Sequence, residues 1–122
     1  MPAKGVAVVT GASYGLGASI AKQLACKVPK YEVVLVARFY SNFRHFHSLL
    51  RSKEKLRELQ FEIAQENGVA LVVEADITDA AAVQNLLDTT LKAFPKGVDV
   101  LVNNAAYVAP IHRSSWGHKL SS

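Results

Sequence analysis

Short apolar runs alternate with amphipathic stretches along this chain. Four runs rich in β-branched residues cover residues 6–9, 33–37, 69–74 and 98–102. Each run is almost continuously apolar, with little alternation of polar and apolar positions. That pattern is typical of strands in a parallel sheet whose two faces are both covered. We therefore expect four buried strands, separated by the amphipathic stretches.

The amphipathic stretches predict three helices. The first begins at Gly15 and stops at Pro29, the second covers residues 53–67 and stops at Asn67-Gly68, and the third begins after an N-cap at Asp79 and ends at Pro95. The apolar face of the first helix is predicted at Leu16, Ile20 and Leu24, with Ala21, Ala25 and Val28 beside them. That of the second is predicted at Leu56, Leu59 and Ile63. The stripe of the third is predicted at Val83, Leu86, Leu87, Leu91 and Phe94.

The strict alternation of strands and helices predicts an α/β fold class. Right-handed crossovers between parallel strands lay the four strands side by side in the order 3-2-1-4. The expected architecture is a Rossmann-type, three-layer, doubly wound parallel sheet.

A glycine-rich loop of the pattern T-G-x-x-x-G-x-G joins the first strand to the first helix. Gly11 permits a tight turn, Gly15 lets a pyrophosphate approach the backbone, and Gly17 permits close packing of the helix. The helix N-terminus offers unpaired N–H groups and partial positive charge to an anion, and Ser13 offers a hydroxyl. The residues expected at a dinucleotide are Gly11, Ser13, Tyr14, Gly15, Leu16 and Gly17. The alternative is a strand-to-helix turn that uses glycine for geometry alone.

The loop resembles the cofactor-binding signature of the short-chain dehydrogenase/reductase family, and two later motifs agree. Residues 76–79 (DITD) resemble the family's acidic motif, and residues 102–106 (VNNAA) resemble its N-N-A-G motif, with Ala106 in place of glycine. The resemblance covers residues 5 to about 106 as an NAD(P)-binding half-domain, followed by an irregular tail at 107–122. It implies cofactor contacts at Asp76, where the family's acid meets the adenine, and at Ile77, Asn103 and Ala105. Asp76 could instead be an ordinary strand-end residue, and Asn103 and Asn104 could simply satisfy loop backbone groups.

The end of the second strand bears on the choice of nicotinamide cofactor. NAD sites place an acid there, but Glu32 precedes the strand and the strand ends at Ala37-Arg38. A guanidinium suits the 2′-phosphate of NADP(H), which we therefore favour, with NAD(H) left open. Tyr14 stands where the family often has a second basic residue, which weakens this signal.

Residues 39–51, rich in aromatic and basic side chains, lengthen a connection that is usually short. Removing them would join Arg38 to Ser52, and a cut one residue earlier would put Arg51 in the place of Arg38. The phosphate-binding arginine is therefore open between Arg38 and Arg51. The insert could be a cofactor lid, an RNA-contacting loop, a surface extension of the following helix or an unspliced segment, and the last two are favoured.

The family's reaction is hydride transfer between nicotinamide and a carbonyl or alcohol, with a Tyr-x-x-x-Lys pair in which the lysine lowers the tyrosine pKa. The residues at +4 from Tyr14, Tyr31, Tyr40 and Tyr107 are Ala18, Leu35, Arg44 and Ile111. We therefore assign no catalytic residue and expect the chain, with fewer strands than the family, to be inactive alone. A non-catalytic nucleotide-binding or subunit-pairing module is the alternative, and residues 98–102 are expected at a bare sheet edge where chains could pair.

Composition and charge indicate the kind of ligand and the cellular location to expect. The 122 residues carry a net charge of +4 and a single cysteine, Cys26, which together suit an anionic ligand and a reducing, cytoplasmic location. No apolar run is long enough for a membrane span, and the N-terminus has no signal-peptide layout. His45 and His47 are spaced like metal ligands but lack recognisable partners, so no metal is expected. Glu54 and Glu58 interrupt the basic stretch around residues 44–57, which argues against a nucleic-acid partner.

Overall fold

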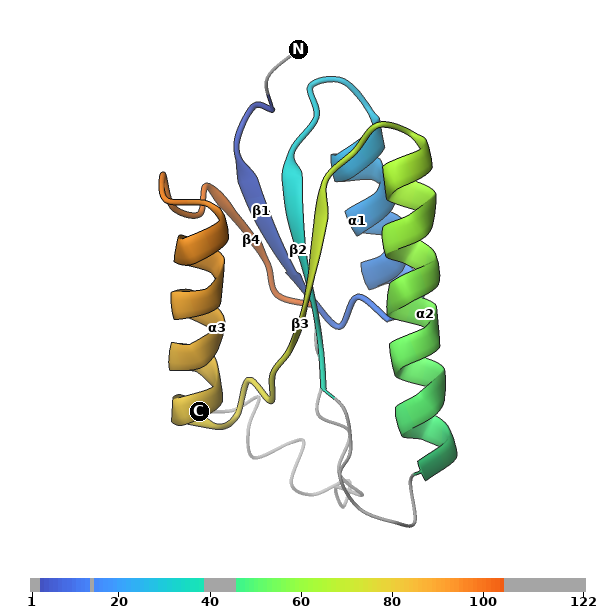
Figure 1. The fold of residues 1–122 in the computed structure, drawn as a ribbon, viewed down its shortest axis with the longest axis vertical. Helices are drawn as coiled ribbons and strands as arrows, with labels where there is room; N and C mark the ends of the chain where they lie inside the picture. Colours follow the sequence, from blue (N-terminus) through green and yellow to red (C-terminus); the bar gives the residue numbers. More distant parts are fainter. Residues whose placement is uncertain (1–2, 14, 39–45, 105–122) are drawn as a thin grey trace, which may run out of the picture.

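Four parallel strands form one sheet, and three helices connect them in the expected alternation (Figure 1). The computed structural model describes residues 3–13, 15–38 and 46–104, with side chains from residue 53 onward in the last range. The elements are β1 (Val6–Thr10), α1 (Gly15–Cys26), β2 (Glu32–Ala37), α2 (Phe46–Gln65), β3 (Ala70–Glu74), α3 (Ala80–Ala93) and β4 (Val100–Val102).

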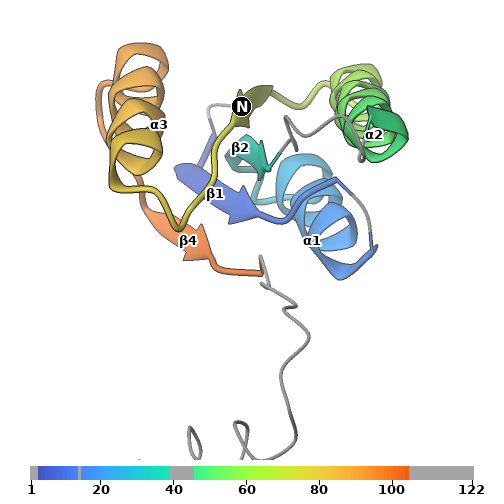
Figure 2. The same ribbon diagram turned by 90° about the horizontal axis from the view of Figure 1, so that it is seen from below.

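The strand order is β3-β2-β1-β4, which confirms the prediction made from the crossover rule. β1 lies in the centre with Val8 beside Val34 of β2 on one side and beside Leu101 of β4 on the other. Helices α1 and α2 cover one face of the sheet and α3 covers the other, giving three layers (Figure 2). All four strands point the same way, so their carboxyl ends meet at one edge, where ligands bind in folds of this kind.

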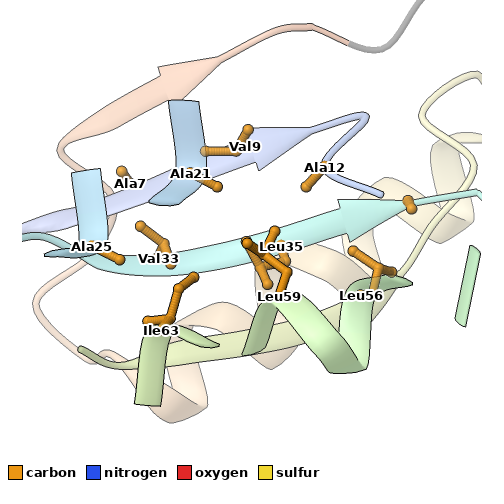
Figure 3. Packing of buried hydrophobic residues seen from close by; sticks show 11 residues of the cluster. Ala7, Val9, Ala12, Ala21, Ala25, Val33, Leu35, Leu56, Leu59 and Ile63 are labelled. Atoms are coloured by element: carbon orange, nitrogen blue, oxygen red, sulfur yellow. The ribbon is translucent and has the colours of Figure 1, made fainter. Parts of the chain in front are cut away.

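The larger core lies between the sheet and helices α1 and α2 (Figure 3). Alternate residues of β1 and β2, such as Val9 and Leu35, point into it, and both are fully buried. From the helices come Leu56, Leu59 and Ile63 of α2 and two alanines of α1. The predicted apolar face of the second helix is therefore confirmed.

The opposite face of the sheet has a smaller core, formed by Val8, Val34, Val73 and the α3 residue Leu86. The side chains of this smaller core do not cover β4. Leu101 is in register with Val8 and so faces the α3 side, yet 65% of it is exposed. The expectation that all four strands are covered on both faces is wrong for β4 within the described residues.

The buried face of α1 agrees only in part with the predicted one. Ala21 and Ala25 are buried and Leu24 packs against the core, as predicted, and Gly17 is buried as well. The prediction that Leu16 and Val28 lie on this face is wrong, since they are 68% and 79% exposed. Small residues let the helix backbone lie close against the sheet, and this close approach turns the larger side chains outward or to the flank. Apolar periodicity alone could not reveal this, because it gives more weight to leucine and isoleucine than to alanine and glycine.

Helix α2 begins at Phe46, seven residues before the predicted start. No glycine or proline interrupts residues 46–52, so the helix continues backward into the predicted insert. That part of the insert is therefore an extension of the following helix, one of the favoured alternatives, while residues 39–45 lie outside the described residues. The helix ends as expected, with Asn67 at φ 62° and the Gly68 N–H donating to the Ile63 carbonyl at 2.8 Å.

Helix α3 begins at the predicted cap, where the Asp79 carboxylate accepts from the Ala81 N–H at 3.1 Å. Its predicted apolar stripe is only partly buried, since Leu87 is 44% and Leu91 47% exposed. Strand β4 is two residues shorter than predicted. Strand β4 starts at Val100, and just before it Asp99 contacts β1 twice: its N–H donates to the Val6 carbonyl at 2.9 Å and its carboxylate accepts from the Val6 N–H at 2.8 Å.

Candidate cofactor site

The loop between β1 and α1 folds back over the carboxyl end of the sheet. Gly11 and Gly15 both have positive φ, at 65° and 66°, a conformation that glycine adopts without strain. The Ala12 N–H donates to the Val36 carbonyl of β2 at 3.1 Å and so fixes the loop against the neighbouring strand. Ser13 follows and is only 9% exposed, and Tyr14 lies outside the described residues.

The first turn of α1 packs directly on this loop. A Cβ added to Gly17 would overlap the carbonyl oxygen of Gly11 and lie 2.6 Å from Asn104 Nδ2. The predicted need for a glycine is therefore confirmed, but its neighbours are the loop and the segment after β4 rather than the sheet. Because the loop backbone cannot yield to a side chain without distortion, Gly17 fixes where the helix N-terminus lies.

The space beside Gly15 is open. Apart from its chain neighbours and the nearby backbone of its own helix, a Cβ added there would meet no described atom within 4 Å, and the first turn of α1 carries no acidic side chain. Leu16, the next residue, is largely exposed. No carboxylate of that turn therefore competes with an anion for the helix N–H groups and the positive end of the helix dipole. These residues fit a diphosphate, which needs open space, backbone donors and positive potential.

Thr10 links the ends of β1 and β4. Its hydroxyl lies 3.3 Å from both the Val102 carbonyl and the Asn103 Oδ1, and it accepts from the Asn104 N–H at 3.0 Å. The Asn104 side chain in turn donates to the Gly11 carbonyl at 3.4 Å. The Asn104 side chain thus satisfies a loop carbonyl, as the alternative for it expected, whereas the Asn103 side chain meets the Thr10 hydroxyl rather than a backbone group. Ligand contact by Asn103 stays a prediction.

Arg38 and Asp76 meet at the carboxyl ends of β2 and β3. Arg38 Nε lies 3.5 Å from Asp76 Oδ2, and both side chains are partly exposed. The other carboxylate oxygen, Oδ1, accepts from the Thr78 hydroxyl at 2.6 Å and from the Thr78 N–H at 2.9 Å. These two hydrogen bonds from Thr78, and then the nearby Arg38 guanidinium, lower the pKa of Asp76, so the carboxylate is charged at neutral pH.

The structure brings most of the predicted residues to one edge of the sheet. Ile77, 37% exposed, stands between Asp76 and Thr78. Arg51 lies in α2, but its side chain is not described, and Ala105 lies outside the described residues. Sequence reasoning assigned no role to Thr10 or Thr78. Their signal was that each lies within a quoted motif, Thr10 at the start of T-G-x-x-x-G-x-G and Thr78 in DITD.

The described part of the chain holds neither a candidate membrane span nor a candidate metal cluster. None of its helices is both long enough and apolar enough to cross a membrane. Among the same residues, no three or more histidine, cysteine or acidic side chains lie together as metal ligands would. Of the two histidines spaced like metal ligands, His45 lies outside the described residues and His47 lies in α2 with its side chain not described.

The glycine corner, the strand order and the motif positions match one family of proteins. The family model described as short chain dehydrogenase matches residues 5–119. The chain belongs to the short-chain dehydrogenase family. The match continues past residue 106, where the resemblance seen in the sequence ended.

Similar members of the short-chain dehydrogenase family are longer. A fatty acyl-CoA reductase from Acinetobacter baylyi is 36% identical over 100 residues, which is 82% of this chain and 28% of the relative. A metagenomic short-chain oxidoreductase solved in complex with NADP has a TM-score of 0.68 at 32% identity, covering 93% of this chain and 47% of that one. A Burkholderia cenocepacia short chain dehydrogenase, also in complex with NADP, has a TM-score of 0.68 at 31% identity, covering 88% and 38%. This chain thus spans less than half the length of these short-chain dehydrogenases.

Proposed function

We propose that this chain is the NADP(H)-binding part of a short-chain dehydrogenase whose reaction moves a hydride between nicotinamide and a carbonyl or alcohol. The observation that carries the cofactor assignment is Arg38. It follows the last residue of β2, at the same edge of the sheet as the glycine corner, where an NAD site would place an acid. Glu32 is the first residue of β2 and so stands at the opposite end of that strand.

The chemistry of the two cofactors makes this position decisive. NADP(H) adds a phosphate to the ribose, and a planar guanidinium can donate two parallel hydrogen bonds to it. The diphosphate would lie beside Gly15 and the N-terminus of α1, with Asp76, Ile77 and Asn103 as further contacts. Support comes from the two similar short-chain dehydrogenases solved with NADP.

Calorimetric titration with NADPH and NADH tests the assignment. We expect tighter NADPH binding by the parent chain. Arg38→Gln should weaken NADPH binding about 10- to 100-fold and leave NADH binding nearly unchanged, because a hydrogen bond to a charged group contributes about 1.5–3 kcal/mol. Arg51→Gln is the matched control. If it, rather than Arg38→Gln, causes the loss, the phosphate contact belongs to Arg51. Tighter NADH than NADPH binding by the parent would overturn the proposal.

A second candidate is a nucleotide-binding or subunit-pairing module without catalysis of its own. It is favoured by β4, an edge strand of the described sheet with Leu101 65% exposed, to which another chain could pair. Because the 122 residues contain no Tyr-x-x-x-Lys, we expect the purified chain to bind NADPH without oxidising it in the presence of carbonyl compounds. Turnover would contradict this. Cys26, the sole cysteine of the sequence, is the basis for including a reducing, cytoplasmic location in the proposal.

A further inference from the structure

The two oxygens of the Asp76 carboxylate have separate partners. Oδ1 accepts both hydrogen bonds from Thr78, at 2.6 and 2.9 Å, and Oδ2 faces Arg38 Nε at 3.5 Å. The Thr78 main chain and side chain hold the same oxygen, so the carboxylate cannot rotate without losing one of them. The orientation of Oδ2 is therefore set by Thr78, two residues further along the chain.

Arg38 needs such a fixed neighbour if it is to select a cofactor. It stands just past the end of β2, where the strand ladder no longer holds the chain, and its side chain is 42% exposed. An arginine side chain has many rotamers, and each one fixed on binding costs entropy. A carboxylate at Nε holds one edge of the planar guanidinium, whose terminal nitrogens carry further N–H donors. The affinity for a phosphate rises when the guanidinium is oriented beforehand.

The charge of Asp76 also opposes a phosphate. Substitutions of Thr78 leave that carboxylate and its charge in place, so they change only how the carboxylate is held. Loss of oriented hydrogen bonds between a guanidinium and a phosphate lowers the affinity about tenfold or more.

We propose that Thr78 is a positioning residue for cofactor selectivity, acting through Asp76 to orient the guanidinium of Arg38 toward the 2′-phosphate. Thr78 need not touch the nucleotide. The inference rests on the proposed function, because it takes Arg38 as the group that distinguishes NADPH from NADH. The low pKa of Asp76 keeps the chain of contacts intact at neutral pH.

The test compares dissociation constants for NADPH and NADH by calorimetry in the parent, Thr78→Val and Thr78→Ser. Thr78→Val removes the hydroxyl and nearly keeps the shape of the side chain. It should raise the dissociation constant for NADPH about 5- to 10-fold and change that for NADH less than twofold. Thr78→Ser restores the hydroxyl and should restore NADPH binding. In an Arg38→Gln background, Thr78→Val should have no further effect. The inference is wrong if Thr78→Val weakens binding of both nucleotides equally or strengthens NADPH binding. It is also wrong if Thr78→Val weakens NADPH binding as much in the Arg38→Gln background as in the parent.

Thr78→Ala provides a second route should Thr78→Val fail to fold. Thr78 is exposed, and alanine removes the same hydroxyl while the charge of Asp76 stays, so the same selective loss of NADPH binding is expected. Unchanged NADPH binding by Thr78→Ala would overturn the inference. Failure of the proposed function gives a different result, because the parent would then show no NADPH preference and Arg38→Gln no loss.

Discussion

Replacing Gly17 with alanine is expected to lower the free energy of unfolding by about 3 kcal/mol. In most helix interiors this change stabilises by up to about 1 kcal/mol, through helix propensity. Here the added Cβ would overlap the Gly11 carbonyl oxygen and lie 2.6 Å from Asn104 Nδ2. The helix must then move away from the loop. Urea unfolding followed by circular dichroism measures the change.

Gly15→Ala is the matched control, at the first residue of α1 and two residues before Gly17. Apart from its chain neighbours and its own helix backbone, its Cβ would meet no described atom within 4 Å, so the cost is that of the φ of 66°, about 1–2 kcal/mol for a residue with a side chain. The expected order is therefore a larger loss at Gly17 than at Gly15. A Gly17→Ala variant as stable as the parent would show that α1 does not pack on the loop as described.

Leu16→Asp is expected to weaken NADPH binding about 100-fold while leaving the fold intact. Leu16 lies in the first turn of α1 and is 68% exposed, so little packing is lost. A carboxylate there would stand near the diphosphate, and like charges about 5 Å apart near a protein surface repel by about 3 kcal/mol. The same carboxylate at a helix N-terminus stabilises the fold by about 0.3–1 kcal/mol. Calorimetry should therefore show a lower NADPH affinity, while thermal unfolding should show a higher melting temperature.

Leu16→Asn separates charge from shape in this experiment. Asparagine has nearly the size of aspartate but no charge, and we expect its NADPH affinity to stay within a few-fold of the parent. If the asparagine and aspartate variants bind equally well, the diphosphate does not lie at the N-terminus of α1. If both lose binding equally, the leucine side chain itself contacts the nucleotide.

The sequence alone determined the succession of strands and helices, the strand order and the place of the glycine corner. Each of these has a local cause. Strands β1 and β2 are continuous apolar runs, Asp79 and Asn67 carry their own helix-end signals, and the crossover rule converts chain order into spatial order. Arg38 at the end of β2 could likewise be found by counting along one strand.

Only the tertiary structure decided which side of α1 is buried and how the site is held together. Ala21 and Ala25 lie against the sheet while Leu16 is turned outward, because the close approach of two backbones outweighs the area of one side chain. Thr10 meets Asn103 and Asn104 from more than 90 positions away, and Asp76, just after β3, links Thr78 to Arg38 at the end of β2. Such contacts depend on register and on side-chain direction across strands, which no local pattern of apolar and polar residues encodes.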